Sequence, residues 1–163
     1  MTDRKNKKII ILDMDGCISN DKWRRDKLLD KRNTEVSTWK EYFDLCPQDV
    51  PIPSTLFTLD LLKEHYDIVV STGRPDSIKK ETLEWLKTNC EITPYAIFMR
   101  PQGVYSSNSI TKSNNLDNII ESLEVHPSDI TAFEDNTDAI DMYKRRNIRV
   151  IEVLLHVVQV TRE

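Results

Sequence analysis

The amino-acid sequence predicts an α/β fold, a three-layer sandwich in which a central parallel sheet lies between two layers of helices. Short apolar segments typical of buried strands alternate with longer segments typical of helices. The chain has 163 residues, which is enough to bury a hydrophobic core, and it contains no internal repeat or low-complexity tract. We therefore expect a single domain that comprises residues 1–163.

The first strand is expected at residues 8–13, because four consecutive aliphatic residues suit a central strand covered on both faces. The other strands are expected at residues 67–72, 96–99, 130–133 and 149–153. Gly73 and Pro75 are expected to end the second strand. Helices are expected to begin near Ser54, at Asp76 or Ser77, at residue 113 and at residue 137. Residues 17–53 are polar and aromatic, with helix-like stretches near residues 21–30 and 37–45.

Two carboxylates follow the first strand directly. Asp13 and Asp15 lie at its expected end, and Gly16 lets the chain turn away at once. Open α/β sheets bind their ligands at the carboxyl ends of the strands. Carboxylates this close repel each other, and a divalent cation with oxygen ligands, typically Mg²⁺, would compensate. Taken alone, the pattern also fits a strand that is followed by an acidic turn.

Other elements bring reactive side chains to the same edge of the predicted sheet. They are Thr72, Lys112, Glu134 and Asp135. Asp13 is best placed to attack phosphorus as a nucleophile, and Asp15 can protonate the leaving oxygen and then take a proton from water. Thr72 and nearby backbone N–H groups can hold phosphoryl oxygens, and Lys112 supplies positive charge. The acidic pair completes the Mg²⁺ site.

These residues form four motifs, which are the two aspartates with Gly16, then Thr72, Lys112 and the acidic pair. In this order they resemble the motifs of the haloacid dehalogenase superfamily of phosphohydrolases, over nearly the whole chain. The family's first motif corresponds to Asp13-Met14-Asp15-Gly16. The resemblance implies a Rossmann-like fold and a Mg²⁺ site formed by the Asp13 carboxylate, the Asp15 backbone carbonyl and an acid of the last motif. Asp135 is the favoured direct ligand, with Glu134 acting through water. Asp138 could also serve, or could simply stabilise the first turn of its helix.

A closer similarity is to the phosphatase domain of bacteriophage-type polynucleotide kinase and its stand-alone relatives. It rests on residues 70–75, 81–86, 98–101, 133–136 and 142–146. The similarity implies that Gly73 and Arg74 bind the substrate phosphate. No kinase activity is expected, because the sequence lacks a GxxxxGK[ST] loop. Cys17 and Glu134 stand where relatives usually carry threonine and aspartate, so Cys17 is expected to pack, and the ligand set stays open.

The superfamily inserts its cap at the position of residues 17–53, which are too few for a full cap domain. We expect a small helical lid that leaves the cleft open to large substrates. Arg24 and Arg25 in the lid, and Arg100 after the third strand, are expected to contact the substrate, although the first two also fit a solvated face. The aromatic residues of the lid can either stack a base or pack the lid onto the core. They are Trp39, Tyr42 and Phe43.

The predicted function is a Mg²⁺-dependent phosphomonoesterase acting on nucleotides or nucleic-acid ends through an aspartyl-phosphate intermediate. A polynucleotide 3′-phosphatase comes first by resemblance. A 5′(3′)-deoxyribonucleotidase acting on free mononucleotides is the alternative, since an aromatic lid could hold one nucleotide. A catalytically silent module that keeps the fold is a third interpretation.

The composition limits the classes of partner and the cellular compartment that we expect for this protein. The net charge of −4 gives no support to broad nucleic-acid coating, and no apolar run reaches the ~20 residues that span a bilayer. The three cysteines lack the spacing of a metal site or a disulfide framework. We expect a cytoplasmic protein with no membrane partner, whose partner is the phosphate at a nucleotide or nucleic-acid 3′ end. Residues 154–163 could add an edge strand or a dimer contact, which leaves the oligomeric state open.

Overall fold

The fold is built around a five-stranded parallel sheet with the strand order β5-β4-β1-β6-β7. The computed structural model describes residues 8–29 and 36–154, so most of the carboxyl-terminal segment at residues 154–163 lies outside the described part. The strands are β1 (Ile9–Leu12), β4 (Asp67–Pro75), β5 (Ala96–Arg100), β6 (Ile130–Glu134) and β7 (Arg149–Glu152).

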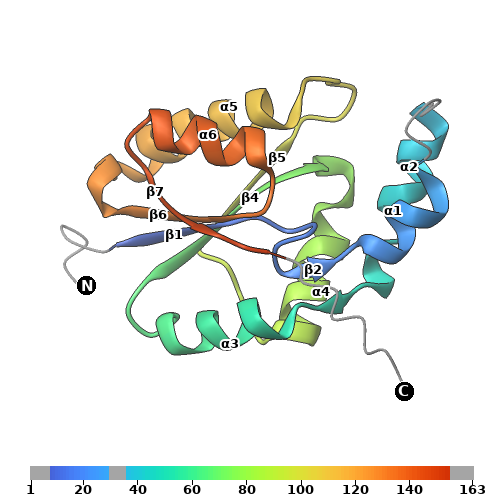
Figure 1. Cartoon of the computed structure of the whole chain (residues 1–163), viewed down its shortest axis with the longest axis horizontal. Coiled ribbons are helices and arrows are strands. Elements are labelled where there is room, and N and C mark those ends of the chain that lie inside the picture. The colour runs from blue at the N-terminus through green and yellow to red at the C-terminus, as the bar shows by residue number, and fades with distance from the viewer. Residues whose placement is uncertain (1–7, 30–35, 155–163) are drawn as a thin grey trace, which may run out of the picture.

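Helices cover both faces of this sheet (Figure 1). One face carries α3 (Pro53–Leu62) and α4 (Lys79–Cys90), and the other carries α5 (Asn108–Leu123) and α6 (Thr137–Arg145). Short 3₁₀ helices occur at η2 (Cys46–Gln48), η3 (Asp76–Ile78) and η4 (Pro127–Asp129). The predicted α/β sandwich with a central parallel sheet is confirmed.

The position of β1 at the centre of the sheet explains why its sequence is apolar without alternation. Ile10 and Leu12 join the core cluster that includes Trp85 of α4. Ile9 and Ile11 join the cluster on the opposite face, which contains residues of α5 and α6. All four β1 side chains are buried, as expected for a strand covered on both sides.

Several element boundaries differ from the predictions, among them the start of α4, which is at Lys79 after the 3₁₀ helix η3 and not at Asp76 or Ser77. β4 continues through Gly73 to Pro75, because the chain pairs again with Arg100 of β5 after an irregularity in register. α3 begins at Pro53 with Ile52 as its N-cap, so Ser54 is not the cap; proline suits this first helical position. α5 begins at residue 108, where the Ser107 hydroxyl accepts a hydrogen bond from the Ile110 N–H (3.3 Å).

Residues 17–53, hereafter the cap segment, connect β1 to α3 in the sequence, and the helices in their described part lie beyond the carboxyl end of the sheet (Figure 1). The short strands β2 (Ser19–Asn20) and β3 (Val50–Pro51) pair antiparallel and form its base. The helices α1 (Lys22–Leu28) and α2 (Val36–Asp44) lie between them in the sequence. The segment therefore contains two small helices at the place where the resemblance implies a lid. Its role as a cap stays a prediction.

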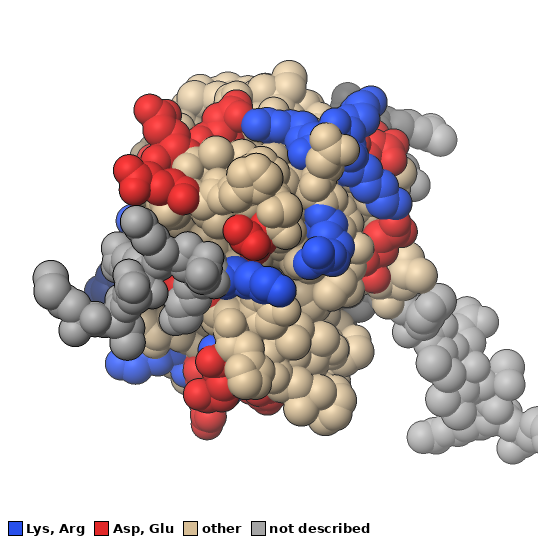
Figure 2. Space-filling model, turned by 90° about the vertical axis from the view of Figure 1, so that its left-hand side faces the viewer, with Lys and Arg blue, Asp and Glu red and all other residues tan. Residues whose placement is uncertain are grey.

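The opposite face of the molecule, at the amino ends of the strands, carries acidic and basic side chains side by side (Figure 2). No broad basic surface is visible there. Among residues 8–29 and 36–154, no helix combines the length and the apolar composition that crossing a membrane requires.

Candidate active site

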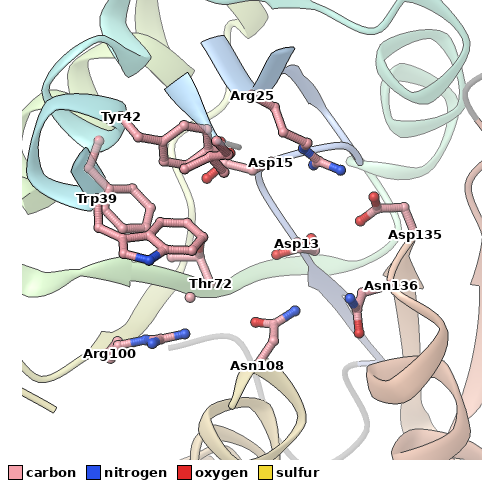
Figure 3. Close-up of a pocket in the computed structure, with 13 residues that line it drawn as sticks. Asp13, Asp15, Arg25, Trp39, Tyr42, Thr72, Arg100, Asn108, Asp135 and Asn136 are labelled. Atoms are coloured by element: carbon pink, nitrogen blue, oxygen red, sulfur yellow. The ribbon is translucent and has the colours of Figure 1, made fainter. Parts of the chain in front are cut away.

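A pocket of about 320 Å³ lies where the carboxyl ends of the strands face the cap segment (Figure 3). The strand ends and the turns after them contribute Asp13, Asp15, Thr72, Gly73 and Asp135. The cap segment contributes Arg25, Leu29, Trp39, Tyr42 and Phe43. The remaining lining residues are Arg100, Asn108 and Asn136. The parallel topology thus brings side chains from distant parts of the sequence into one hollow.

A buried lysine holds Asp13 in place. The Lys112 Nζ donates to Asp13 Oδ1 (2.5 Å), to the Ser71 carbonyl (2.7 Å) and to Glu134 Oε2 (2.9 Å). Lys112 lies in the second turn of α5 and not at its start as predicted, because the helix begins earlier. Burial disfavours the charge on Lys112, but Asp13 and Glu134 outweigh burial and raise its pKa. Lys112 therefore stays a cation beneath the pocket.

Three acids form a cluster that suits a divalent cation. Oxygen atoms of Asp13, Glu134 and Asp135 lie within 4.8 Å of one another. Burial first, and the Glu134 carboxylate second, raise the pKa of Asp13 well above its usual value. The same two causes raise the pKa of Asp135 to about 6. A cation would relieve this repulsion, and a set of oxygen ligands alone fits Mg²⁺.

The two acids of the last motif differ in what they contact. Glu134 Oε1 accepts the backbone N–H groups of Asp135 (3.2 Å) and Asn136 (3.1 Å), while Oε2 accepts from Lys112. Asp135 faces the pocket, and it approaches the chain so closely at Gly16 that a Cβ there would lie 2.1 Å from Asp135 Oδ2. Gly16 also has φ +82°, which favours glycine. Asp135 is thus the more accessible acid of the pair, whereas Asp138 is exposed and lies outside the cluster.

Asp15 is held by two arginines. Arg74 donates to it through Nη2 (2.5 Å) and Nε (3.1 Å), and the Arg24 Nη2 donates to the same carboxylate. Burial alone would raise the pKa of Asp15, but Arg74 and then Arg24 outweigh burial and lower it. Asp15 is consequently an ionised carboxylate in this arrangement.

Arg24 and Arg74, which are expected to contact the substrate, instead contact protein acceptors in this structure. Both side chains are fully buried, and neither lines the pocket. Arg24 donates to Asp49 through Nε (2.9 Å) and Nη2 (2.7 Å), and its guanidinium lies 4.0 Å from the centre of the Tyr42 ring. Arg74 also donates to Ser19 Oγ (3.1 Å). These donors are directed to protein acceptors because two acids, the partly buried Asp15 and the buried Asp49, need neutralising.

The other predicted substrate contacts line the pocket. Arg25 is half-exposed and donates to Asp21 Oδ2 (2.7 Å), and it reaches into the pocket on the side away from Arg100 (Figure 3). The Arg100 Nη1 donates to the Ser106 carbonyl (3.0 Å). Gly73 leaves room for neighbours, since a Cβ there would lie 2.9 Å from Asn108 Oδ1. The buried Thr72 hydroxyl accepts the Arg74 N–H (3.2 Å).

The aromatic residues of the cap segment differ in whether they pack inside the protein or offer a ring to a ligand. Tyr42 is 4 % exposed and packs within the segment, with its hydroxyl donating to Asp21. Trp39 is 39 % exposed and lines the pocket while it stacks on Phe43 at 6.0 Å between ring centres. Tyr42 is thus largely a packing residue, whereas Trp39 offers a ring surface to a ligand.

Sequence reasoning missed three polar residues at or near the site. Asn136 caps α6 by accepting from the Ala139 N–H (3.1 Å), and its position after the acidic pair and before a helix could have identified it. Asn108 precedes the helix start predicted at residue 113, whereas it is the first residue of α5. Asp49 is buried and accepts from Ser19, Trp23 and Arg24, and no local sequence pattern marks it.

The comparisons with known proteins identify the class of fold. No family model and no curated protein matches the sequence. A chain in the structure of the Pnkp1/Rnl/Hen1 RNA repair complex superposes with a TM-score of 0.66 at 20 % identity, over 94 % of this chain and 44 % of that one. The chain therefore spans less than half the length of that protein.

Two bacterial structures are similar over most of both chains. A haloacid dehalogenase-like hydrolase from Streptococcus pneumoniae has a TM-score of 0.65 at 12 % identity, over 90 % of this chain and 84 % of that chain. CbbY from Rhodobacter sphaeroides, in complex with phosphate, has a TM-score of 0.65 at 12 % identity, over 90 % and 85 %. The chain has the haloacid dehalogenase fold, and the resemblance inferred from the motifs is confirmed at the level of the fold.

Proposed function

We propose that this protein is a Mg²⁺-dependent phosphomonoesterase acting on the terminal phosphate of a nucleotide or nucleic acid, with a 3′-phosphorylated end as the first candidate. The observation that carries the proposal is the Asp13 carboxylate, which Lys112 holds at a pocket shared with the acidic cluster. Similarity to a chain of an RNA repair complex supports the nucleic-acid end as substrate class.

The proposed reaction has two steps. A carboxylate oxygen of Asp13 forms a bond to phosphorus while the bond from phosphorus to the ester oxygen breaks, and the leaving oxygen takes a proton. Water then attacks the aspartyl-phosphate, loses a proton to a base, and releases phosphate with Asp13 regenerated. Thr72, Arg25 and Arg100 line the space around the phosphoryl oxygens. Mg²⁺ held by Asp13, Asp135 and the Asp15 carbonyl would neutralise charge on the phosphoryl group.

Asp15 is the proposed proton carrier. Its surroundings suit the uptake of a proton from water better than the donation of a proton to the leaving oxygen. Because Arg74 and Arg24 lower its pKa, Asp15 is ready to accept the proton of the attacking water. To protonate the leaving oxygen in the first step, Asp15 must carry a proton, which requires weaker contact with the two arginines. Arg24 and Arg74 are therefore proposed as residues that position Asp15.

A 5′(3′)-deoxyribonucleotidase is the second candidate, and the half-exposed Trp39 at the pocket favours it, since one free nucleotide could stack there. A silent module is the weakest interpretation, because Asp13, Asp15, Thr72 and Lys112 are all present and clustered.

The proposal is tested by phosphate release with Mg²⁺ and with EDTA. The substrates are a 3′-phosphorylated oligonucleotide, its 5′-phosphorylated isomer, and the free 3′- and 5′-mononucleotides. We expect Mg²⁺-dependent release that is fastest from the 3′-phosphorylated oligonucleotide. Preference for free mononucleotides would instead establish the nucleotidase, and no release from any of the four would contradict both.

A further inference from the structure

A second hollow adjoins the catalytic pocket. It has a volume of about 770 Å³ and lies between α2, the start of α4 and the loop that follows β5. It shares four lining residues with the catalytic pocket, namely Trp39, Phe43, Arg100 and Asn108. The two hollows therefore lie side by side, and the second one is called the groove hereafter.

The groove has an apolar and aromatic surface with no excess of positive charge. Val104 is 43 % exposed and Tyr105 is 71 % exposed, and both line the groove with Trp39. The described charged residues of its lining are two cations and two acids: Lys40, Arg100, Asp44 and Glu81. Lys40 pairs with Asp44 at 2.5 Å. A run of phosphates needs a cationic lining, whereas a flat uncharged ring fits this surface.

The position of the groove restricts what can occupy it. A phosphate ester that reaches Asp13 occupies only part of the pocket of about 320 Å³ with its phosphoryl group, and the rest of the substrate extends toward the rim. Trp39 and Arg100 form the rim on the side away from Asp135 (Figure 3). A substrate that extends past this side of the rim lies against Trp39, which lines both hollows.

We propose that the groove binds the base of the nucleotide that carries the scissile phosphate, with Trp39 as its stacking surface. This inference rests on the proposed function and narrows it, because it assigns recognition to one base and not to a run of backbone phosphates. Pockets that combine an apolar lining with a few polar groups are typical of such ligands.

The test measures binding, so that it does not depend on turnover. The full chain carries Asp13→Asn to prevent consumption of the ligand, alone or combined with Trp39→Ala or Trp39→Phe. Calorimetric titration gives the Kd of a nucleoside 3′-monophosphate and of the matching sugar phosphate without a base. Phe57→Ala is the control, since Phe57 is an aromatic residue on α3 with 66 % exposure that lines neither hollow.

We expect Trp39→Ala to weaken nucleotide binding at least about fivefold, the lower end of what stacking one base contributes, and to change sugar phosphate binding by less than about twofold. Trp39→Phe should keep most of the affinity, and Phe57→Ala all of it. Equal weakening for both ligands, no weakening, or equal affinity of the parent for the two ligands would overturn the base site. Selective weakening in a protein that hydrolyses none of the phosphate esters would leave the base site standing and refute the proposed function.

Discussion

At the scale of single residues, the site depends on how buried charges are shared. Lys112 contacts Asp13 and Glu134 at the same time, so one cation compensates two carboxylates. Asp135 has no such contact with Lys112 among the described ion pairs. The negative charge of the neighbouring Glu134 also disfavours a negative charge on Asp135. A bound cation would therefore give Asp135 the compensation that Lys112 gives the other two acids of this cluster.

The raised pKa of Asp135 predicts how pH affects the metal-free protein. Its value of about 6 lies above the ordinary value near 4, so the folded state binds the proton more tightly than the unfolded state between these values. Stability should therefore fall as pH rises through this window, and Asp135→Asn should remove that part of the slope. The slope is measured as the difference in Tm between pH 5 and pH 7 in EDTA. Each kcal/mol of lost stability should lower the Tm by roughly 2–4 °C.

Two results would count against this assignment. One is an identical pH slope in wild type and Asp135→Asn. The other is an equal rise of the unfolding midpoint in both proteins when Mg²⁺ is added at pH 7, because a cation that binds the cluster should stabilise chiefly the protein that keeps its ligand.

At the scale of elements, the cap segment is tied to the catalytic loop through one buried acid. Asp49, just before β3, accepts from Ser19 of β2 and from Trp23 and Arg24 of α1. Arg24 in turn contacts Asp15 in the turn after β1. The orientation of the proposed proton carrier therefore depends on the packing of the cap segment.

Asp49→Asn should destabilise the protein by about 3–5 kcal/mol, because it removes one partner of a buried ion pair and leaves Arg24 and Arg74 to share the single carboxylate of Asp15. Denaturant unfolding measures the loss. The matched control is Asp44→Asn, which breaks the exposed pair with Lys40 and should cost less than about 1 kcal/mol. A loss for Asp49→Asn as small as that of the control would contradict the anchoring role.

The elements also show what sequence could and could not predict. The apolar runs predicted the strands, and residues at strand ends predicted which side chains meet, since parallel topology alone brings Asp13, Thr72 and Asp135 together. The direction of long side chains was not predictable. Arg24 and Arg74 turn inward because Asp49, more than twenty residues from Arg24 in the sequence, completes their surroundings.

At the scale of the whole molecule, the proposed reacting groups lie at one end of the sheet, and the cap segment is proposed to meet the rest of the substrate. All five strands point their carboxyl ends toward the cap segment (Figure 1). The opposite face shows mixed charges and no such concentration of groups (Figure 2). The account therefore places all of the chemistry at one end of the molecule and makes Asp13 its centre.

The measurement that tests this claim most directly is mass spectrometry of the protein after acid quenching during turnover of a 3′-phosphorylated dinucleotide with Mg²⁺. The account predicts one added phosphoryl group on the peptide that contains Asp13. Asp13→Asn should show no such adduct and less than about one percent of wild-type turnover, because the nucleophile is lost while the shape is kept. Turnover with the phosphoryl group on another residue, or undiminished turnover in Asp13→Asn, would contradict the account.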